Sequence, residues 1–543
     1  MHNSLFNMPL IPVKLQRKLV ENFKALLILG SRFRPLRSTG MYVYEVMQFI
    51  IRKRFASVPG VRAVYVCHSL AAGECYPGLS DFDITIVFDN PDPLVFYPGL
   101  RKRWGSLKRY FPINDLSVLT VAEFEEWQNI GGGWDPVEEI RHWRLLAGEE
   151  LRQVKFSADT EAANLDRMAW ALGHFQNLLG IAIKEEQRCT GMALVARRNL
   201  HKYFWNTVHA TDPKYMSIGA RRKRIEKWIQ DRGMPHPVEQ LQAMKARQFV
   251  DGPVTTLRFE VAAFAYLLLD QSLQDNPILA RKLYKPIPQG GSTPIGNHVE
   301  VEERARAICD AYREIIGEQV LSVILSATGT ARGYSIYVVL HDGLSMCEIA
   351  GVLRDIRAIH RVFDDSWFNE HLPAGIPIVC SKAMFFARLQ SGRSSLHYFD
   401  KFRSVLYGPD LYALATTEPT QEYLPEIKAA QQIDWRREKL LYSLNLHQIY
   451  FVGLKPALYD YLTFYLPRVI TQSSSGFLPV TAKEAVDHFA QLIDHGQGEI
   501  PRRMFEQFEG EDLDYLLKNL DHSAFAESWP VLQKGLYGVL GHP

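Results

Sequence analysis

The chain has 543 residues, of which 47% are hydrophobic and 22% are charged, and its formal net charge is +2. These values are typical of an ordinary soluble globular protein, and so small a net charge gives no strong overall attraction for nucleic acid. No apolar run reaches the roughly 20 residues that span a bilayer. The six cysteines include no C-x-x-C pair, so a zinc site is not expected. We expect free thiols in a reducing cytoplasm instead.

The start of the chain is expected to be helical. The segment YVYEVMQFIIRKRF carries an apolar stripe at helical spacing and leads into the first expected strand. Strands are expected near residues 63–68, 81–88 and 116–121, and helices over EFEEWQ and DPVEEIRHWRLLAGEEL. This mixture of strands and helices predicts an α+β fold for the first part of the chain.

Two carboxylates lie one residue apart on the second of these strands. Side chains at positions i and i+2 of a strand share a face, so Asp81 and Asp83 project side by side, while Phe82, Ile84 and Ile86 face a core. Neighbouring carboxylates repel one another unless a cation lies between them. Mg2+ prefers carboxylate oxygens together with substrate phosphates, so the pattern predicts a site for Mg2+ or Mn2+.

Residues on either side of the acidic pair complete the expected site. Ser69 and Gly73 lie in an upstream turn, where a hydroxyl and backbone N–H groups can meet a phosphate, and Ser80 directly precedes the pair. Asp115 opens a further apolar strand, INDLSVLTV. The other interpretations are a solvated strand end for the S-D-x-D segment and a strand-start cap, beside Asn114, for Asp115.

The segment HSLAAGECYPGLSDFDITIVF resembles the Gly-Ser, spacer, Asp-x-Asp signature of the DNA-polymerase-β-like nucleotidyltransferase superfamily. It is most similar to the small-molecule and minimal members, and the resemblance is specific over about Val61–Leu119. The family has Gly-Ser at the turn, whereas this chain has His68-Ser69, and a Cβ at that position would crowd a triphosphate. The resemblance implies that Asp81 and Asp83 bridge two metal ions and that Asp115 holds the catalytic one.

The resemblance also implies a helical domain that follows the sheet, and residues 153–284 show the helical pattern. Family members close a cation of that domain over the triphosphate. Arg198 and Lys202, in ARRNLHKYFW, share a helix face and are the candidates. The competing interpretation is a solvated basic face, and the basic run RRKRIEKW is interpreted in the same way.

The second half of the chain repeats the pattern of the first. After KPIPQGGSTPIGN, the best linker candidate, a helix leads into VLSVILSATGTARGYSIYVVLHD. Aligned with the first copy, its apolar face is kept by Ile336, Val338 and Leu340. Gly333 and Ser335 stand where the acidic pair stood. The strand GIPIVCS is expected to place Gly375 at the position of Asp115.

We therefore expect an α+β protein in which a nucleotidyltransferase sheet domain and a helical domain occur twice in tandem, the second copy without metal ligands. The expected function is transfer of a nucleoside monophosphate from an NTP, with ATP as the expected nucleotide, to a hydroxyl of an unidentified acceptor. The alternatives are an RNA or protein acceptor, although nucleic acid is less favoured, and an inactive nucleotide-binding or scaffold protein. A part starting near Asn297 is expected to fold by itself. The expected parts are 1–57, 58–152, 153–284, 285–298, 299–412 and 413–543.

Overall fold

The computed structural model describes a subset of the chain. The described residues are 34–71, 82–89, 99–100, 102–105, 107, 113–129, 143–153, 161–184, 203–204, 206–207, 257–274, 283–284, 298–327, 334–363, 365–372, 375–391, 403–417, 482–492 and 502. Within these ranges, no helix is both long and apolar enough to cross a membrane. The fold class predicted from the sequence is confirmed, because these residues form an α+β structure with two mixed sheets.

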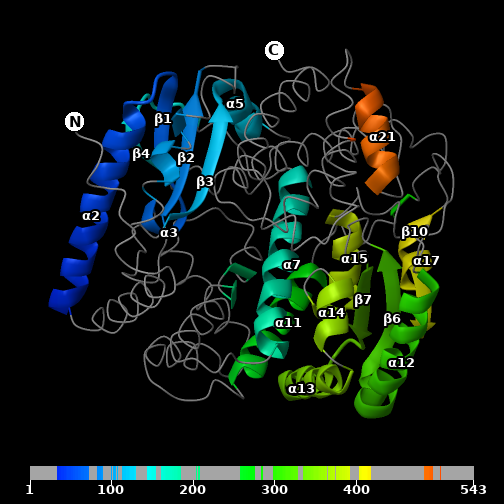
Figure 1. The fold of residues 1–543 in the computed structure, drawn as a ribbon. Coiled ribbons are helices and arrows are strands. Elements are labelled where there is room, and N and C mark those ends of the chain that lie inside the picture. Colours follow the sequence, from blue (N-terminus) through cyan, green and yellow to red (C-terminus); the bar gives the residue numbers. More distant parts are fainter. Residues whose placement is uncertain are drawn as a thin grey trace.

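The first part of the chain forms a four-stranded sheet covered by helices on both faces (Figure 1). Its elements are α2 (Arg34–Ala56), β1 (Val61–Val66), α3 (His68–Ala71), β2 (Phe82–Phe88), β3 (Ile113–Thr120), α5 (Val121–Asn129) and β4 (Arg144–Gly148). The strand order is β3-β2-β1-β4, with β1 antiparallel to β2 and β4, and β2 parallel to β3. The two helices cover opposite faces, since Tyr44 of α2 stacks on Phe82 and Phe124 of α5 stacks on Tyr65.

The strand predicted at 81–88 is present from Phe82 onward, but two other predictions need correction. β3 begins at Ile113, ahead of the expected start. The helix predicted over DPVEEIRHWRLLAGEEL is wrong over Arg144–Gly148, which is an edge strand paired with β1. The apolar pair Leu145 and Leu146 fits a helix stripe as well as a short strand, and only the pairing with β1 decides between them.

The second part contains another four-stranded sheet with its own helices. Its elements are α12 (His298–Ile316), the 3-10 turn η2 (Gly317–Gln319), β6 (Val320–Ala327), β7 (Tyr334–Leu340), α13 (Met346–Val362), α14 (Asp365–His371), β8 (Ile378–Ser381), α15 (Lys382–Ser391), β9 (Arg403–Tyr407) and α17 (Leu411–Ala415). The strand order is β8-β7-β6-β9, with β6 antiparallel to β7 and β9, and β7 parallel to β8. Order and directions are those of the first sheet.

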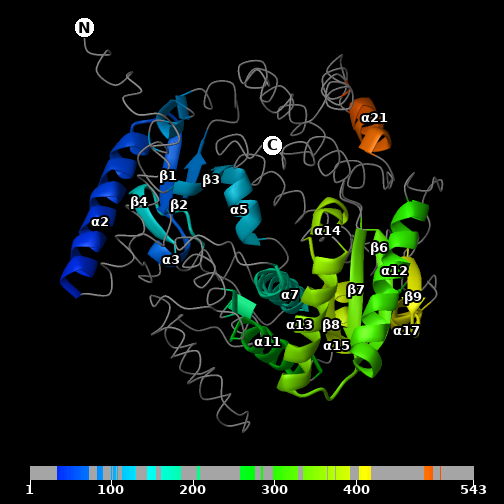
Figure 2. The ribbon, with the colours of Figure 1, turned by 60° about the horizontal axis from the view of Figure 1, so that its bottom comes forward.

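Two long helices lie between the sheets and pack on the second one. α7 (Glu161–Ile183) and α11 (Leu257–Gln274) contact α13 and α15, and both views show them on the side of the second sheet that faces the first (Figure 2). Their buried side chains, such as Leu179 and Phe264, belong to one continuous core with Ile336 and Val338. The helical segment 153–284 and the second sheet therefore share a core, so the expectation that a part starting near Asn297 folds alone is revised.

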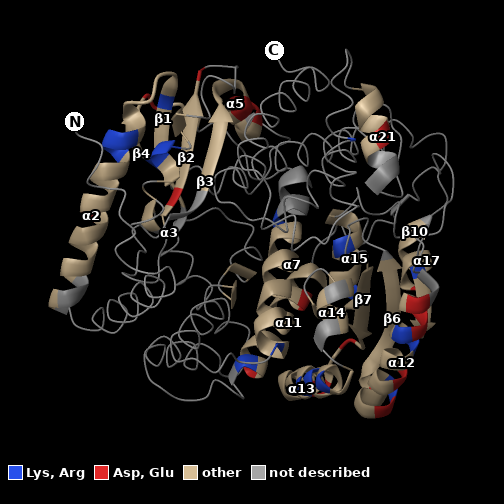
Figure 3. Ribbon diagram, in the orientation of Figure 1, with Lys and Arg blue, Asp and Glu red and all other residues tan. Residues whose placement is uncertain are grey.

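The remaining described elements are short. β5 (Leu283–Tyr284) pairs in parallel with β10 (Thr416–Thr417), and α21 (Ala482–Leu492) is the last described helix. The expected linker at 285–298 therefore starts directly after a strand, and its residues up to 297 lie outside the described ones. Lys, Arg, Asp and Glu gather on outer helices such as α12 and α13, whereas the strands carry few of them (Figure 3).

Candidate functional site

Asp83, the second residue of β2, is a buried carboxylate among mainly apolar neighbours in its strand. Every residue of β2 is buried, and Asp83 itself is only 9% exposed. Its backbone is fixed, because the Cys67 N–H donates to the Asp83 carbonyl at 2.9 Å. A buried ionised group needs a compensating charge or strong hydrogen bonds, so the burial of Asp83 marks this end of β2 as a candidate site.

The polar face of β2 continues behind this carboxylate. Thr85 is 2% exposed, and its Oγ1 lies 3.3 Å from the Sγ of Cys67, the residue that directly follows β1. The next residue on that face is Val87, which is fully buried with Leu119 and Phe124. The prediction that Phe82, Ile84 and Ile86 face a core is confirmed, and the structure adds that the opposite face is covered as well.

The register between β2 and β3 places Asp115 directly beside Asp83. Phe82 pairs with Ile113, but the next pair is Asp83 with Asp115, so the ladder shifts by one residue and passes over Asn114. Such bulges re-aim a strand and are frequent next to active sites. The prediction that Asp115 lies on a strand neighbouring that of Asp83 is therefore confirmed for the backbone.

Most of the other predicted residues fall outside the described part of the chain. Asp81, Gly73, Ser80, Arg198 and Lys202 are not described. The turn predicted at His68-Ser69 is the beginning of the short helix α3, directly after β1, and Ser69 is placed there by its backbone. The structure thus brings together Asp83, Asp115 and the chain at Ser69 around the adjacent ends of β1, β2 and β3.

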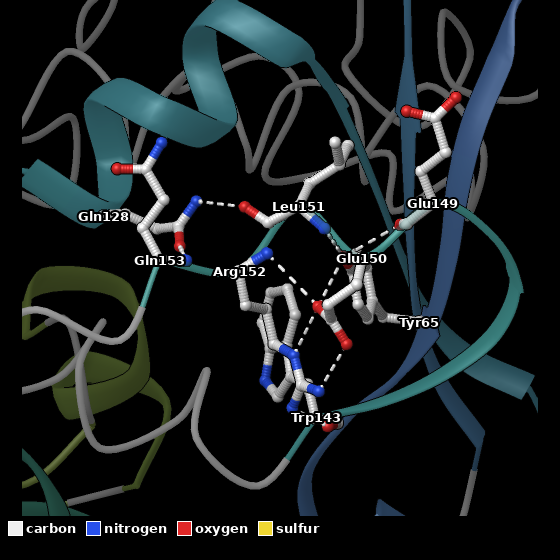
Figure 4. Close-up of polar contacts among 8 residues, drawn as sticks. All are labelled: Tyr65, Gln128, Trp143, Glu149, Glu150, Leu151, Arg152 and Gln153. Carbon is white, nitrogen blue, oxygen red and sulfur yellow. Dashed lines mark hydrogen bonds and ion pairs between the residues drawn. The ribbon is translucent and has the colours of Figure 1, made fainter.

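A cluster of polar contacts holds the exit of β4 against β1 (Figure 4). The Tyr65 hydroxyl donates to Glu150 Oε1 at 3.1 Å and accepts from the Leu151 N–H at 2.7 Å. Arg152 binds Glu150 through Nε at 2.7 Å and through Nη2 at 2.5 Å. Burial raises the pKa of Tyr65 far above its usual value, so the phenol stays neutral and acts as a structural hydrogen-bonding group.

A second set of contacts fixes the carboxyl end of β3. The Thr120 Oγ1 accepts from the Glu123 N–H at 3.1 Å, and Glu123 Oε2 accepts from the Thr120 N–H at 2.8 Å. This reciprocal capping box starts α5 directly after the strand. Sequence reasoning missed Tyr65 and Glu150, whose contact joins distant parts of the chain. The T-x-x-E spacing of Thr120 and Glu123, however, was a readable signal.

The corresponding positions of the second sheet carry no carboxylate among the described residues. Ser326 pairs with Ser335 there, as Cys67 and Asp83 are joined in the first sheet. The register of β7 with β8 pairs Tyr337 with Ile378. The ladder begins at Ile378 and does not reach residue 375, so the alignment of Gly375 with Asp115 stays a prediction.

Asp83 is the only member of the predicted metal set whose side chain is described, and the described residues alone include no group of three or more His, Cys, Asp or Glu that could hold a metal ion. The chain was compared with protein-family models, curated proteins and solved structures, and none of them matches it.

Proposed function

We propose that the chain is a metal-dependent nucleotidyltransferase that moves a nucleoside monophosphate from an NTP to an acceptor hydroxyl. The observation that carries the proposal is the pairing of Asp83 with Asp115 across two parallel strands, reached through a bulge that passes over Asn114. Residues opposed on neighbouring strands share a face. Asp81, two residues before Asp83, shares that face if the strand continues, which gives three carboxylates at one edge.

Three carboxylates are the donor set that a hard divalent cation such as Mg2+ or Mn2+ requires. Asp81, Asp83 and Asp115 would hold the ions, which polarise the α-phosphate and stabilise both the attacking and the leaving oxygen. Asp115 is the candidate to accept the proton of the acceptor hydroxyl. Ser69, Gly73 and Ser80 would bind the β- and γ-phosphates of ATP or another NTP, with Arg198 and Lys202 as the candidate cations over them.

The likeness of the two sheets supports a tandem duplication. Both have one order and one set of strand directions. Both have ladder shifts at matching places, between Val61 and Ala63 in β1 and between Val320 and Ser322 in β6. With Ser335 at the position of Asp83, we propose that the second copy is a binding or scaffold module without a catalytic metal.

The proposal is tested with Asp83→Asn in the full chain, and Asp89→Asn is the matched control. Asp89 lies just beyond the other end of β2, half-exposed in an ion pair with Arg62. Mn2+ binding is measured by the paramagnetic relaxation of water, and transfer by incubation with each α-labelled NTP and cell lysate. We expect Asp83→Asn to lose both signals and Asp89→Asn to keep them. Equal Mn2+ binding by the wild type and Asp83→Asn contradicts the metal site.

The same incubation separates the acceptor classes. Label on small molecules, RNA or protein identifies the acceptor. Mn2+ binding without label on any acceptor favours an inactive nucleotide-binding protein, since the metal site would then exist without turnover. Nucleotide binding in that case is measured with a non-hydrolysable NTP, and its loss in Asp83→Asn with retention in Asp89→Asn places the nucleotide at the same edge of the sheet.

A further inference from the structure

A second buried carboxyl group lies far from the candidate site, on helix α11. Asp270 is 8% exposed, and its Oδ2 accepts from Gln274 Nε2 at 2.8 Å. Its Oδ1 is buried and makes no hydrogen bond of ordinary length and angle to the described residues. Burying half of a carboxyl group without a partner is unfavourable, and more so when the group is ionised.

Asp270 lies near the C-terminal end of α11 and beside the start of α15, a helix that follows the second sheet's strand β8. Ser381, the last residue of β8, caps α15, because its Oγ accepts from the Met384 N–H at 3.1 Å. The Ser381 hydroxyl is also a neighbour of the Asp270 carboxyl and of the Tyr266 hydroxyl. A side chain of α11 therefore reaches the N-terminal end of α15, where backbone N–H groups are left without helical partners.

The first sheet satisfies the same junction in a different way. There, β3 leads into α5, and Thr120 and Glu123 cap the helix within one segment of chain. In the second sheet, Ser381 matches Thr120, but the position of Glu123 is held by Met384, which has no carboxylate. Asp270 brings a carboxyl group to this junction from another helix.

The titratable groups around Asp270 are Tyr266 of the same helix, Asp342 after β7 and Cys380 of β8. Of these, Asp342 makes ionisation of Asp270 less favourable through its charge. No basic side chain in the described part of the chain acts on Asp270. Burial, followed by the charge of Asp342, raises its pKa above the usual aspartate value, against the opposing hydrogen bonds of Ser381 and Gln274.

We propose that Asp270 is a clasp that holds α11 against the start of α15 while it is a neutral acid and loosens this contact when it ionises. A neutral carboxyl group can donate as well as accept, so it suits a pocket that contains the Tyr266 and Ser381 hydroxyls. The clasp joins the helical segment between the two sheets to the second sheet. Its state therefore adds to or subtracts from the stability of a junction that the shared core also holds.

The direction of the pH effect follows from linkage. A carboxyl group whose pKa is higher in the folded than in the unfolded protein stabilises the fold fully below its unfolded value, near 3.8. This contribution is lost as the pH rises through the folded value. The α11–α15 contact is therefore expected to be tighter at acidic than at neutral pH.

The test compares the full chain with Asp270→Asn, which keeps the shape but cannot ionise, and with Asp310→Asn, the same change on an exposed face of α12. Thermal unfolding is followed between about pH 4 and pH 8. We expect the Tm of Asp270→Asn to exceed that of the wild type by an amount that grows with pH, while Asp310→Asn parallels the wild type. Hydrogen exchange of α11 and α15, corrected for its intrinsic pH dependence, should show protection that falls with pH in the wild type only.

Two outcomes overturn the clasp. A Tm difference between Asp270→Asn and the wild type that does not change with pH shows that Asp270 does not titrate in this range. An Asp270→Asn protein that is less stable than the wild type at pH 8, or fails to fold there, shows that the junction needs the ionised carboxylate.

Discussion

Gly148 and Gly408 occupy the same place in the two sheets. Gly148 is the last residue of β4 and Gly408 directly follows β9, and their φ angles are positive, 87° and 74° respectively. A Cβ on Gly148 would lie 1.9 Å from the carbonyl oxygen of Arg62 on β1, and a Cβ on Gly408 would lie 2.1 Å from that of Leu321 on β6. The two sheets thus share a requirement for glycine where the end of the edge strand, β4 or β9, lies against its neighbour, β1 or β6.

Substitution of either glycine by alanine is expected to destabilise the protein. The left-handed backbone alone costs about 1–2 kcal/mol with a side chain, and the contact with the β1 or β6 carbonyl adds to it. Gly343→Ala is the control, since Gly343 has a φ of 82° but no atom within 4 Å of a new Cβ. Chemical denaturation should therefore rank Gly148→Ala and Gly408→Ala below Gly343→Ala, and equal losses for all three would exclude the close approach.

The hydrogen-bonded pair of Glu150 and Arg152, here called the clamp, predicts that the stability of the protein depends on pH. Hydrogen bonds from the Arg152 side chain, more than any other cause, lower the pKa of Glu150 below its usual value of 4.5. A carboxylate of this kind stabilises the fold above that value, and its contribution is lost as the pH falls through the folded pKa.

Glu150→Gln should therefore be less stable than the wild type at neutral pH and approach it at about pH 3. The difference is expected to be at most about 1 kcal/mol, since solvent screens the partly exposed side chain of Glu150. Glu125→Gln on α5, an exposed glutamate, is the control. A constant gap between Glu150→Gln and the wild type across this pH range would mean that shape rather than charge holds the clamp.

His360 predicts a second, separate loss of stability in acid. It lies 2% exposed on α13, stacked on Phe368 with the ring centroids 3.6 Å apart. Burial lowers its pKa to about 3. Below pH 6.5 the unfolded chain takes up a proton that the folded protein does not, so stability falls by up to about 1.4 kcal/mol per pH unit between those values.

His360→Gln should remove this slope even if it lowers stability at neutral pH through lost packing. The control is His371→Gln, because His371 also stacks on an aromatic ring, that of Trp367. Calorimetric unfolding of the wild type and both variants between about pH 4 and pH 7 tests whether His360 causes the fall in stability. If His360→Gln shows the same dependence of stability on pH as the wild type, another titrating group causes that dependence.

Local patterns predicted the apolar strands but not the contacts that close the fold. The alternation of Phe82, Ile84 and Ile86 was sufficient to predict β2, because burial of one face follows directly from a period of two. The strand at Arg144–Gly148 was missed because it exists through its pairing with β1. Tyr65 and Glu150 likewise meet only after β4 has folded back.

Local patterns were also insufficient to show which parts of the chain share a core. The proline- and glycine-rich segment at 285–298 has the composition of a linker, yet α7 and α11 before it share a core with the sheet after it. A part of the chain starting near Asn297 would expose the surface that these helices cover. We expect that part to be unfolded or aggregated by circular dichroism and size exclusion. A part starting near residue 155 should fold, and equal behaviour of the two would contradict the shared core.

The sequence predicted that Asp115 lies on the strand beside Asp83, while the ladder shift that pairs Asp83 with Asp115 rather than with Asn114 was not visible in it. This shift gives the last prediction, which depends on the proposed metal site. The double variant Asn114→Asp/Asp115→Asn moves the carboxylate by one residue. It leaves the composition and the net charge of the chain unchanged. Since successive residues of a strand point to opposite faces, the moved carboxylate should not replace Asp115.

Loss of an outer-shell partner already weakens metal binding roughly 10–100-fold, so Mn2+ affinity should fall by at least about tenfold in the double variant. Asp115→Asn alone should fall equally, and wild-type affinity in the double variant would show that Asn114 and Asp115 are interchangeable and that the register does not define the site.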